Sequence, residues 1–374
     1  MTSHLCVIGN SHVAALKDGW PPLTELANHV EADFFGCLKD GMKSFGEIDG
    51  KPFDRIVLKT EQAEVAVLSL GGITQSWVIP TPNGPLDVVL GYDDPFDYID
   101  NPDYLGTTVG RVANRISGAQ FELDGEIYPL SQNGPGMTLH GGTNGLSKRN
   151  WTVVDVGETY VELTYTSAHL EEGFPGNVEF TMLITLEGAR LNYHIGATVD
   201  RPTPINFAQH NYYNLLGGGP IWDHQMQISA THYAPLGDDL LPTGEIASIA
   251  GTPFDYRTLR SFAEADPNRK GMDMAYVLPA DRDLDDPVAQ VKAPNGVTLQ
   301  LWTDQPCLQT YNGNNQSVQT SGASGRPFGR CSAICIEPQR HSNAVNTPAF
   351  PSIIVTPEMP YAYRTAIEIQ STSA

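Results

Sequence analysis

Two residues suited to proton transfer, a histidine and a glutamate, each interrupt a β-prone segment of this 374-residue chain. His210 lies in residues 205–215, INFAQHNYYNL, which are predicted to form one β-strand ending at a triple-glycine turn. Because successive strand side chains point to opposite faces, Asn206, His210, Tyr212 and Asn214 would share a polar face. Histidine can give or take a proton near neutral pH. This face suggests a wet cavity with an ionisable group and is compatible with an enzyme, while a structural histidine is the alternative that this segment alone leaves open.

The glutamate, Glu337, lies in the apolar segment 334–339, ICIEPQ. In a strand it would share a face with Cys335 and Gln339. A carboxylate in such a segment is rarely buried without a partner. Burial would raise its pKa, whereas hydrogen-bond donors would lower it. A surface or ion-paired glutamate is the alternative, and this segment alone does not separate the two.

Further polar candidates lie in glycine-rich turns and in two more β-prone segments. Asn114 and Arg115 belong to GRVANRI at residues 110–116, and an arginine fork or a carboxamide could bind a polar ligand. His140 precedes paired glycines, which let the backbone approach a ligand closely. A structural arginine and a histidine in an ordinary glycine turn are the alternatives. Asp273 and Gln309, the latter on the same strand face as Tyr311, complete the set.

These residues need a β scaffold, and the alternation of β-prone segments and turns along the chain predicts one. Short β-branched and aromatic runs alternate with turns, and the chain has 36 Gly and 28 Pro. This pattern predicts an all-β antiparallel sandwich or barrel. Residues 13–16 and 23–30 look helical instead. We therefore expect an N-terminal extension over residues 1–52, either an arm packed on the sheet or an unrelated segment, and a catalytic domain over residues 53–374.

Composition and cysteine usage narrow the possible partners. The formal net charge of −21 disfavours binding to nucleic acid or to an anionic membrane. Five scattered cysteines form neither a disulfide framework nor a zinc pattern, and Cys331 and Cys335 are expected to be buried. No apolar run has the length of a membrane helix, and the N-terminus lacks a signal-peptide pattern. The missing membrane and signal segments predict a cytoplasmic protein. The missing P-loop, GxGxxG and HExxH motifs predict that it uses no metal or nucleotide cofactor.

Taken in order, these segments resemble the aldose 1-epimerases, also called galactose mutarotases, from about Glu64 to Ile369. The segments that carry the resemblance are GRVANR (110–115), LHGG (139–142), QHNYYNL (209–215), LPTGE (241–245), Asp273, Gln309 with Tyr311, and EPQ (337–339) followed by Asn346 and FPS (350–352).

The resemblance implies a large antiparallel β-sandwich of the galactose-mutarotase type that interconverts the α and β anomers of a free aldose, galactose or glucose, without a cofactor. By position, Glu337 resembles the general base of the family and His210 its general acid. Asn114, Arg115, His140, Asp273 and Gln309 match positions that hold the sugar or the acid. Tyr212, Tyr311 or Trp77 could present an apolar face to the sugar, although packing in the core is the favoured alternative for each. The protein would act on a small monosaccharide, as a monomer or homodimer.

In this scheme the base and the acid lie on opposite sides of the sugar, and the pKa of Glu337 stays below that of His210. Three departures from the usual family wording, Met274, Ser342-Asn343 and Ala208-Gln209, leave the preferred sugar open. A hexose 6-phosphate mutarotase would need a basic cluster that this chain lacks. A sugar-binding protein without activity would not need both an acid and a base, and a glycosidase normally uses two carboxylates.

Overall fold

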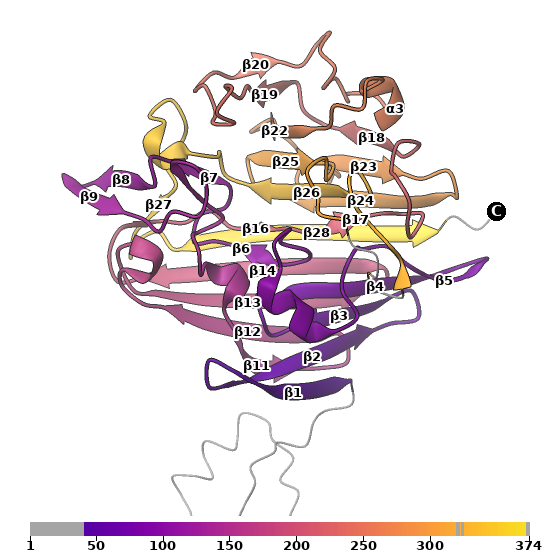
Figure 1. Cartoon of the computed structure of the whole chain (residues 1–374), viewed down its shortest axis with the longest axis horizontal. Helices are drawn as coiled ribbons and strands as arrows, with labels where there is room; N and C mark the ends of the chain where they lie inside the picture. Colours follow the sequence, from indigo (N-terminus) through magenta and orange to yellow (C-terminus); the bar gives the residue numbers. More distant parts are fainter. Residues whose placement is uncertain (1–40, 319–321, 323–324, 372–374) are drawn as a thin grey trace, which may run out of the picture.

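Antiparallel sheets dominate the protein, as the computed structural model shows for residues 41–318, 322 and 325–371 (Figure 1). The helical segments expected at residues 13–16 and 23–30 lie outside the described residues. Strand β1 (Met42–Ile48) pairs with β2 (Lys51–Lys59), so the chain just before residue 52 already belongs to a sheet. The boundary at residue 52 stays a prediction.

Within the described residues, three sheets make up most of the structure. The five-stranded sheet contains β1, β2, β3 (Glu64–Leu68), β4 (Ile73–Thr81) and β5 (Gly84–Asp87). The nine-stranded sheet has the order β11 (Thr152–Val156), β12 (Tyr160–Ser167), β13 (Val178–Glu187), β14 (Arg190–Val199), β28 (Tyr361–Ser371), β24 (Val297–Thr303), β23 (Ala289–Lys292), β18 (Gln225–Ile228) and β21 (Arg260–Ser261). The six-stranded sheet has the order β17 (Tyr212–Tyr213), β26 (Ile334–Gln339), β25 (Cys307–Tyr311), β22 (Asp273–Val277), β19 (His232–Ala234) and β20 (Ala247–Ser248).

Four two-stranded ladders and a few short helices complete the described structure. The ladders are β6 (Thr108–Val109) with β16 (Ala208–Gln209), β7 (Arg115–Ser117) with β10 (Met137–Leu139), β8 (Gln120–Leu123) with β9 (Glu126–Pro129), and β15 (Thr203–Pro204) with β27 (Ile354–Val355). The helices are α3 (Phe262–Ala265) and the 3₁₀ turns η1 (Pro95–Asp100), η2 (Leu146–Lys148), η3 (Glu171–Gly173) and η5 (Ala344–Asn346). No helix in these ranges is long and apolar enough to cross a membrane.

One large apolar core joins the three sheets. Trp77 of the five-stranded sheet, Phe180 of the nine-stranded sheet and Ile336 of the six-stranded sheet belong to the same buried cluster. A backbone bridge joins Val89, just after β5, to Tyr213 of the six-stranded sheet. The predicted all-β antiparallel sandwich is confirmed. The core occupies one face of the six-stranded sheet, which leaves the opposite face free to carry polar groups.

Candidate active site

Strand alternation places the polar residues of the six-stranded sheet on the face opposite the core. In β26, Ile334 and Ile336 belong to the apolar core, whereas Cys335 and Glu337 point the other way. The register sets Glu337 opposite Gln309 of β25. The same register sets Asp273 of β22 opposite Tyr311. Side chains that are scattered over 65 positions of sequence are thus neighbours on one surface.

His210 does not lie in a continuous strand, contrary to the prediction for residues 205–215. The chain pairs with β6 through β16, leaves that ladder, and then pairs with β26 through β17. His210 lies between the two short strands, and its backbone is fixed by bonds from its N–H to the Thr107 carbonyl (2.8 Å) and from the Gly106 N–H to its own carbonyl (3.1 Å). This change of partner points the imidazole toward Glu337.

Two other sequence expectations around this strand, that Asn206 and Asn214 share a polar cavity face with His210, are wrong, whereas the core-packing alternative for Trp77 is confirmed. Asn206 donates to the Arg340 carbonyl, and Asn214 donates to the carbonyls of Gly219 and Ser332, so both carboxamides hold loops together. Trp77 is fully buried in the core, where it packs edge-on against Tyr213, and it offers no face to a ligand. The break in the strand explains why the two asparagine side chains do not face the cavity, because residues 206 and 214 lie outside the short segment that lines it.

Asn114 and His140 come from two turns that lock together. The Asn114 N–H donates to His140 Nδ1 (3.2 Å), and the His140 N–H donates to the Asn114 carbonyl (3.0 Å). A Cβ at Gly141 would lie 1.8 Å from the Gly110 carbonyl oxygen, so only glycine permits this approach. Of the two nearby arginines, Arg111 is the structural one, since its guanidinium donates to loop carbonyls. Arg115 is left to face the cavity.

These segments enclose a cavity of about 240 Å³. All eight residues predicted for the site line it: Asn114, Arg115, His140, His210, Tyr212, Asp273, Gln309 and Glu337. Tyr311, and Leu139 of the LHGG segment, also line it, together with residues that the sequence did not single out, namely Pro102, Asp103, Tyr104 and Asn315. The Tyr104 ring lies 4.6 Å from the His140 ring and 6.2 Å from the His210 ring, centroid to centroid. Tyr104 belongs to no recognisable sequence motif. Its aromatic side chain, a residue type common in ligand pockets, is the one signal that could have identified it.

The two residues predicted to act as acid and base, His210 and Glu337, lie close together. His210 Nε2 lies 3.6 Å from Glu337 Oε1, and both side chains are almost completely buried. Burial lowers the pKa of His210 to about 4. Burial also raises the pKa of Glu337 well above its ordinary value, and the nearby charge of Asp273 adds to that rise while Arg115 opposes it. The expectation that the Glu337 pKa stays below that of His210 is not met in the empty site, because a dry environment disfavours both charges.

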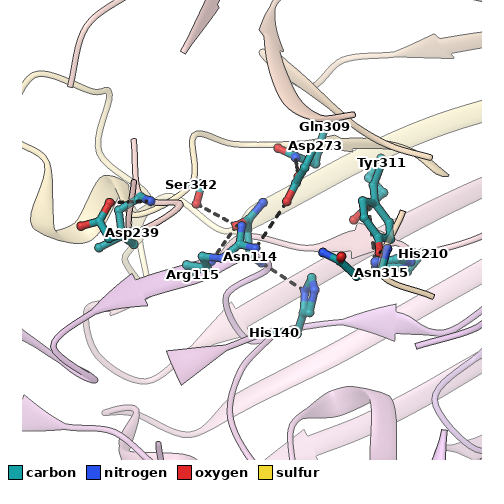
Figure 2. A network of polar contacts seen from close by, with 12 residues as sticks. Asn114, Arg115, His140, His210, Asp239, Asp273, Gln309, Tyr311, Asn315 and Ser342 are labelled. Carbon is teal, nitrogen blue, oxygen red and sulfur yellow. Dashed lines mark hydrogen bonds and ion pairs between the residues drawn. The ribbon is translucent and has the colours of Figure 1, made fainter. Parts of the chain in front are cut away.

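A polar network lies beside this pair (Figure 2). Asp273 accepts a hydrogen bond from Gln309 Nε2 and forms an ion pair with Arg115 at 3.4 Å. Asn114 Oδ1 accepts from the Arg115 N–H (2.9 Å) and from the Ser342 hydroxyl (3.0 Å). Burial lowers the pKa of His140 well below its ordinary value, and repulsion from His210, when that ring is protonated, and from Arg115 lowers it further. The network therefore offers fixed donors and acceptors around a neutral imidazole.

Not all of the residues that differ from the usual family sequence line the cavity. Met274 lies next to Asp273 but points away from the cavity and belongs to the apolar core. Ser342 reaches the site indirectly through Asn114. Asn343 accepts from the Ser117 N–H and hydroxyl, which fixes the end of β7.

One group of potential metal ligands is present in the described part of the chain. Ligand atoms of His210, Cys335 and Glu337 lie within 4.8 Å of one another. The imidazole, however, turns Nδ1 to the thiol and Nε2 to the carboxylate. A single ion could not replace both contacts unless the ring turned, so the arrangement suits proton transfer better than metal binding.

Comparisons with known proteins agree with one another. A sequence model of the family described as aldose 1-epimerase matches residues 54–368. Galactose mutarotase of Bos taurus is 35% identical over 324 residues, which cover 83% of this chain and 92% of that protein. Aldose 1-epimerase of Escherichia coli K12 is 32% identical over 314 residues, covering 81% and 90%. The crystal structure of an aldose epimerase homologue from C. elegans superimposes with a TM-score of 0.81 at 26% identity, covering 85% of this chain and 99% of that one.

Proposed function

This chain belongs to the aldose 1-epimerase family, and on that premise we propose that it interconverts the α and β anomers of galactose or glucose in the cavity around His210 and Glu337. Family membership confirms the fold type and the isomerase class predicted from the sequence. The observation that carries the choice of site is the buried contact of 3.6 Å between His210 Nε2 and Glu337 Oε1. The cavity of about 240 Å³ lies just below the ~300–1,000 Å³ of drug-sized sites and suits one small sugar ring.

The contact between the two groups matches the chemistry of ring opening. Opening removes a proton from the C1 hydroxyl and adds one to the ring oxygen, and both oxygens are bonded to C1. A base and an acid that lie side by side can therefore serve both oxygens at once. This arrangement replaces the expected one with Glu337 and His210 on opposite sides of the sugar. After opening, the C1–C2 bond rotates, and closure on the other face of the aldehyde reverses the two transfers.

Before a sugar binds, burial favours a single proton on this pair over two separated charges. Above about pH 4 His210 is neutral, while burial keeps Glu337 protonated well beyond the usual range of a carboxyl. The working arrangement, with Glu337 as the base toward the C1 hydroxyl and His210 as the acid toward the ring oxygen, contains the same single proton. Only its position differs, and a shift across the 3.6 Å contact when sugar hydroxyls solvate the carboxylate would convert one arrangement into the other.

The surrounding side chains supply sugar binding. Arg115, Asp273 and Gln309 already contact one another, so their orientation is set before the ligand enters. Charge-assisted bonds from Arg115 and to Asp273 would fix hydroxyls of the sugar. Tyr212, whose ring stacks on His210 at 5.1 Å, and Tyr311 would face its C–H groups. Ordered partners of this kind lower the entropic cost of holding the reacting atoms in place.

Charge at the cavity wall favours an unphosphorylated sugar. Asp103, Asp273 and Glu337 supply three carboxyl groups to the lining, whereas Arg115 is its one permanent cation and is engaged by Asp273. A phosphate carries nearly two negative charges and would gain little from this wall.

Three of the described cysteines, Cys307, Cys331 and Cys335, are free and buried, which suits a reducing compartment and supports a cytoplasmic location. With galactose or glucose as substrate, the enzyme would belong to hexose metabolism.

Polarimetry of freshly dissolved sugars tests the proposal. The purified protein should accelerate the mutarotation of α-galactose or α-glucose in a saturable manner, and should act far more slowly on glucose 6-phosphate. A protein that binds these sugars but leaves their anomer exchange at the spontaneous rate would be a binding protein, and the proposal would fail. Preference for the phosphorylated sugar would instead overturn the argument from the carboxyl-rich wall.

A further inference from the structure

Strand order gives the cavity two distinct ends. The six-stranded sheet begins with β17, β26, β25 and β22, so Tyr212 comes first across the sheet, followed by Glu337, Gln309 and Asp273. His210 directly precedes β17, and its ring stacks on Tyr212. The reacting pair therefore has the network of Gln309 and Asp273 on one side and a different group of side chains on the other.

The chemistry of ring opening determines which end of a hexose points to which side. The C1 hydroxyl at Glu337 and the ring oxygen at His210 are both bonded to C1, so they define one edge of the sugar. C2 continues the ring on the Glu337 side, whereas C5, which carries C6, is bonded to the ring oxygen on the His210 side. Turning the ring over about this edge exchanges its faces but leaves C6 on the same side. C6 is therefore directed away from Gln309 and Asp273.

Two loops that are bonded to each other form the end beyond the imidazole. Asp103 lines the cavity from the loop before β6, and Asn315 lines it from the loop after β25. The Ser317 N–H donates to Asp103 Oδ2 (3.2 Å), and the Ser317 hydroxyl donates to Oδ1 (3.4 Å). The Tyr212 hydroxyl donates to the Asp103 carbonyl (2.9 Å), and the Asn315 N–H donates to the Tyr311 hydroxyl (3.0 Å), which places Asn315 beside Tyr311 (Figure 2). Both loops are thus tied to the sheet at this end.

The carboxyl of Asp103 makes this end negative. Burial raises the pKa of Tyr212 and of Tyr311, and the nearby charge of Asp103 adds to both rises. Asp103 itself is half-buried; burial raises its pKa, and the hydrogen bonds that it accepts oppose that rise. Arg115, the one permanent cation of the lining, lies on the other side and is engaged by Asp273. No positive charge of the lining therefore offsets Asp103.

We propose that this end is a subsite for the C6 hydroxymethyl group of a hexose and that Asp103 makes it selective for a neutral, hydroxylated C6. The inference rests on the proposed function, since Glu337 and His210 set the direction of the sugar ring. The carboxylate accepts a hydrogen bond from the C6 hydroxyl, and a 6-deoxyhexose has no such donor. A hexuronate brings a second carboxylate next to the first, and the two repel each other. The substrate class is hexoses with a free C6 hydroxyl.

Two substitutions of Asp103 separate charge from hydrogen bonding. Asp103→Asn removes the negative charge but keeps an oxygen acceptor in a side chain of the same shape, whereas Asp103→Ala removes both. Asp97→Asn is the matched control, because Asp97 is an exposed aspartate of η1, six positions earlier, that does not line the cavity. If the acidity of the whole chain rather than Asp103 repels anionic sugars, the two asparagine variants should behave alike.

The kinetic readout is kcat/KM for D-galacturonate and for D-fucose, the 6-deoxy form of D-galactose, each divided by kcat/KM for D-galactose. Asp103→Asn should raise the galacturonate ratio about tenfold, because a half-exposed charge is only partly screened, and should change the fucose ratio by less than about threefold. Asp103→Ala should raise both ratios by about five- to tenfold. An unchanged galacturonate ratio in Asp103→Asn, or an equal rise in Asp97→Asn, would overturn the proposal.

Titration calorimetry of the same three sugars supplies the second readout. In the wild type, galacturonate should bind about tenfold more weakly than galactose, and the Kd ratios in the variants should shift in the same directions as the kinetic ratios. Binding needs no turnover, so these ratios judge Asp103 even if galactose exchanges its anomers only at the spontaneous rate, a result that would refute the proposed function alone. Equal affinity of the wild type for galacturonate and galactose would overturn the subsite, and binding of neither sugar would overturn both proposals.

Discussion

Removing Glu337 and His210 together should slow the enzyme no more than removing the more important of the two. Each positioned proton transfer typically contributes about 10² to 10⁴ in rate, or about 3 to 5 kcal/mol. Independent contributions would multiply to about 10⁴ to 10⁸ in the double variant. The 3.6 Å contact and the single shared proton couple the two groups, so that they act as one catalytic unit. If one group is removed, the other has no partner to reverse its proton transfer when the ring closes. We therefore expect Glu337→Gln, His210→Asn and their combination each to lose at least about a hundredfold in kcat, without multiplication.

The assay is anomer exchange followed by NMR magnetisation transfer between the two C1 protons, with the spontaneous rate subtracted. Both substitutions preserve approximate shape, and circular dichroism with thermal unfolding should show that the variants remain folded. His232→Asn, an exposed histidine on β19 of the same sheet, is the matched control and should retain full activity. A double variant that loses the product of the two single losses would refute the idea of one coupled pair. Near-normal turnover in either single variant would refute the role of that residue.

Three further predictions follow from the described structure. Arg115→Lys should raise KM about tenfold with a smaller effect on kcat, as initial-rate measurements would show, because the fork that engages Asp273 and the sugar acts before and during the reaction; an unchanged KM would argue against this contact. Met274→Leu should leave the ratio of kcat/KM for galactose and glucose within about twofold and cost less than about 1.5 kcal/mol of stability, because this side chain packs in the core; a changed sugar preference would contradict that placement. Burial lowers the pKa of His224 to about 4, so the unfolded chain takes up its proton first as the pH falls from 6.5 toward 4. The free energy of unfolding should then drop by about 3 kcal/mol from this residue, and urea titrations of His224→Gln should show a weaker loss over that range than those of the wild type; identical pH dependence would contradict the assignment.

Local pattern was sufficient to predict the scaffold and the polar face of β26. Alternation within a strand is a short-range property, so Glu337 and Cys335 could be placed on one face from the sequence. The stretch around His210 could not be predicted in the same way. Its chain changes from β6 to β26 as partner, and partner choice depends on residues about a hundred positions away or more.

The walls of the cavity were harder to predict than its polar floor. Tyr104 and Asp103 lie in a turn without a motif, and only the fold brings them beside His210 and His140. Met274 is next to Asp273 in sequence and therefore close to the site, but strand alternation turns its side chain into the core, away from any sugar. The reversal of the pKa order in the empty site likewise depends on burial, which residue types alone do not reveal.

The protonation state of His210 in the empty enzyme is the quantity that tests the buried, one-proton pair most directly. A ¹⁵N NMR titration of the imidazole should show a neutral ring from pH 8 down to about pH 5 and protonation near pH 4. An imidazolium signal at pH 7, or titration near the ordinary histidine value of about 6.5, would contradict the account.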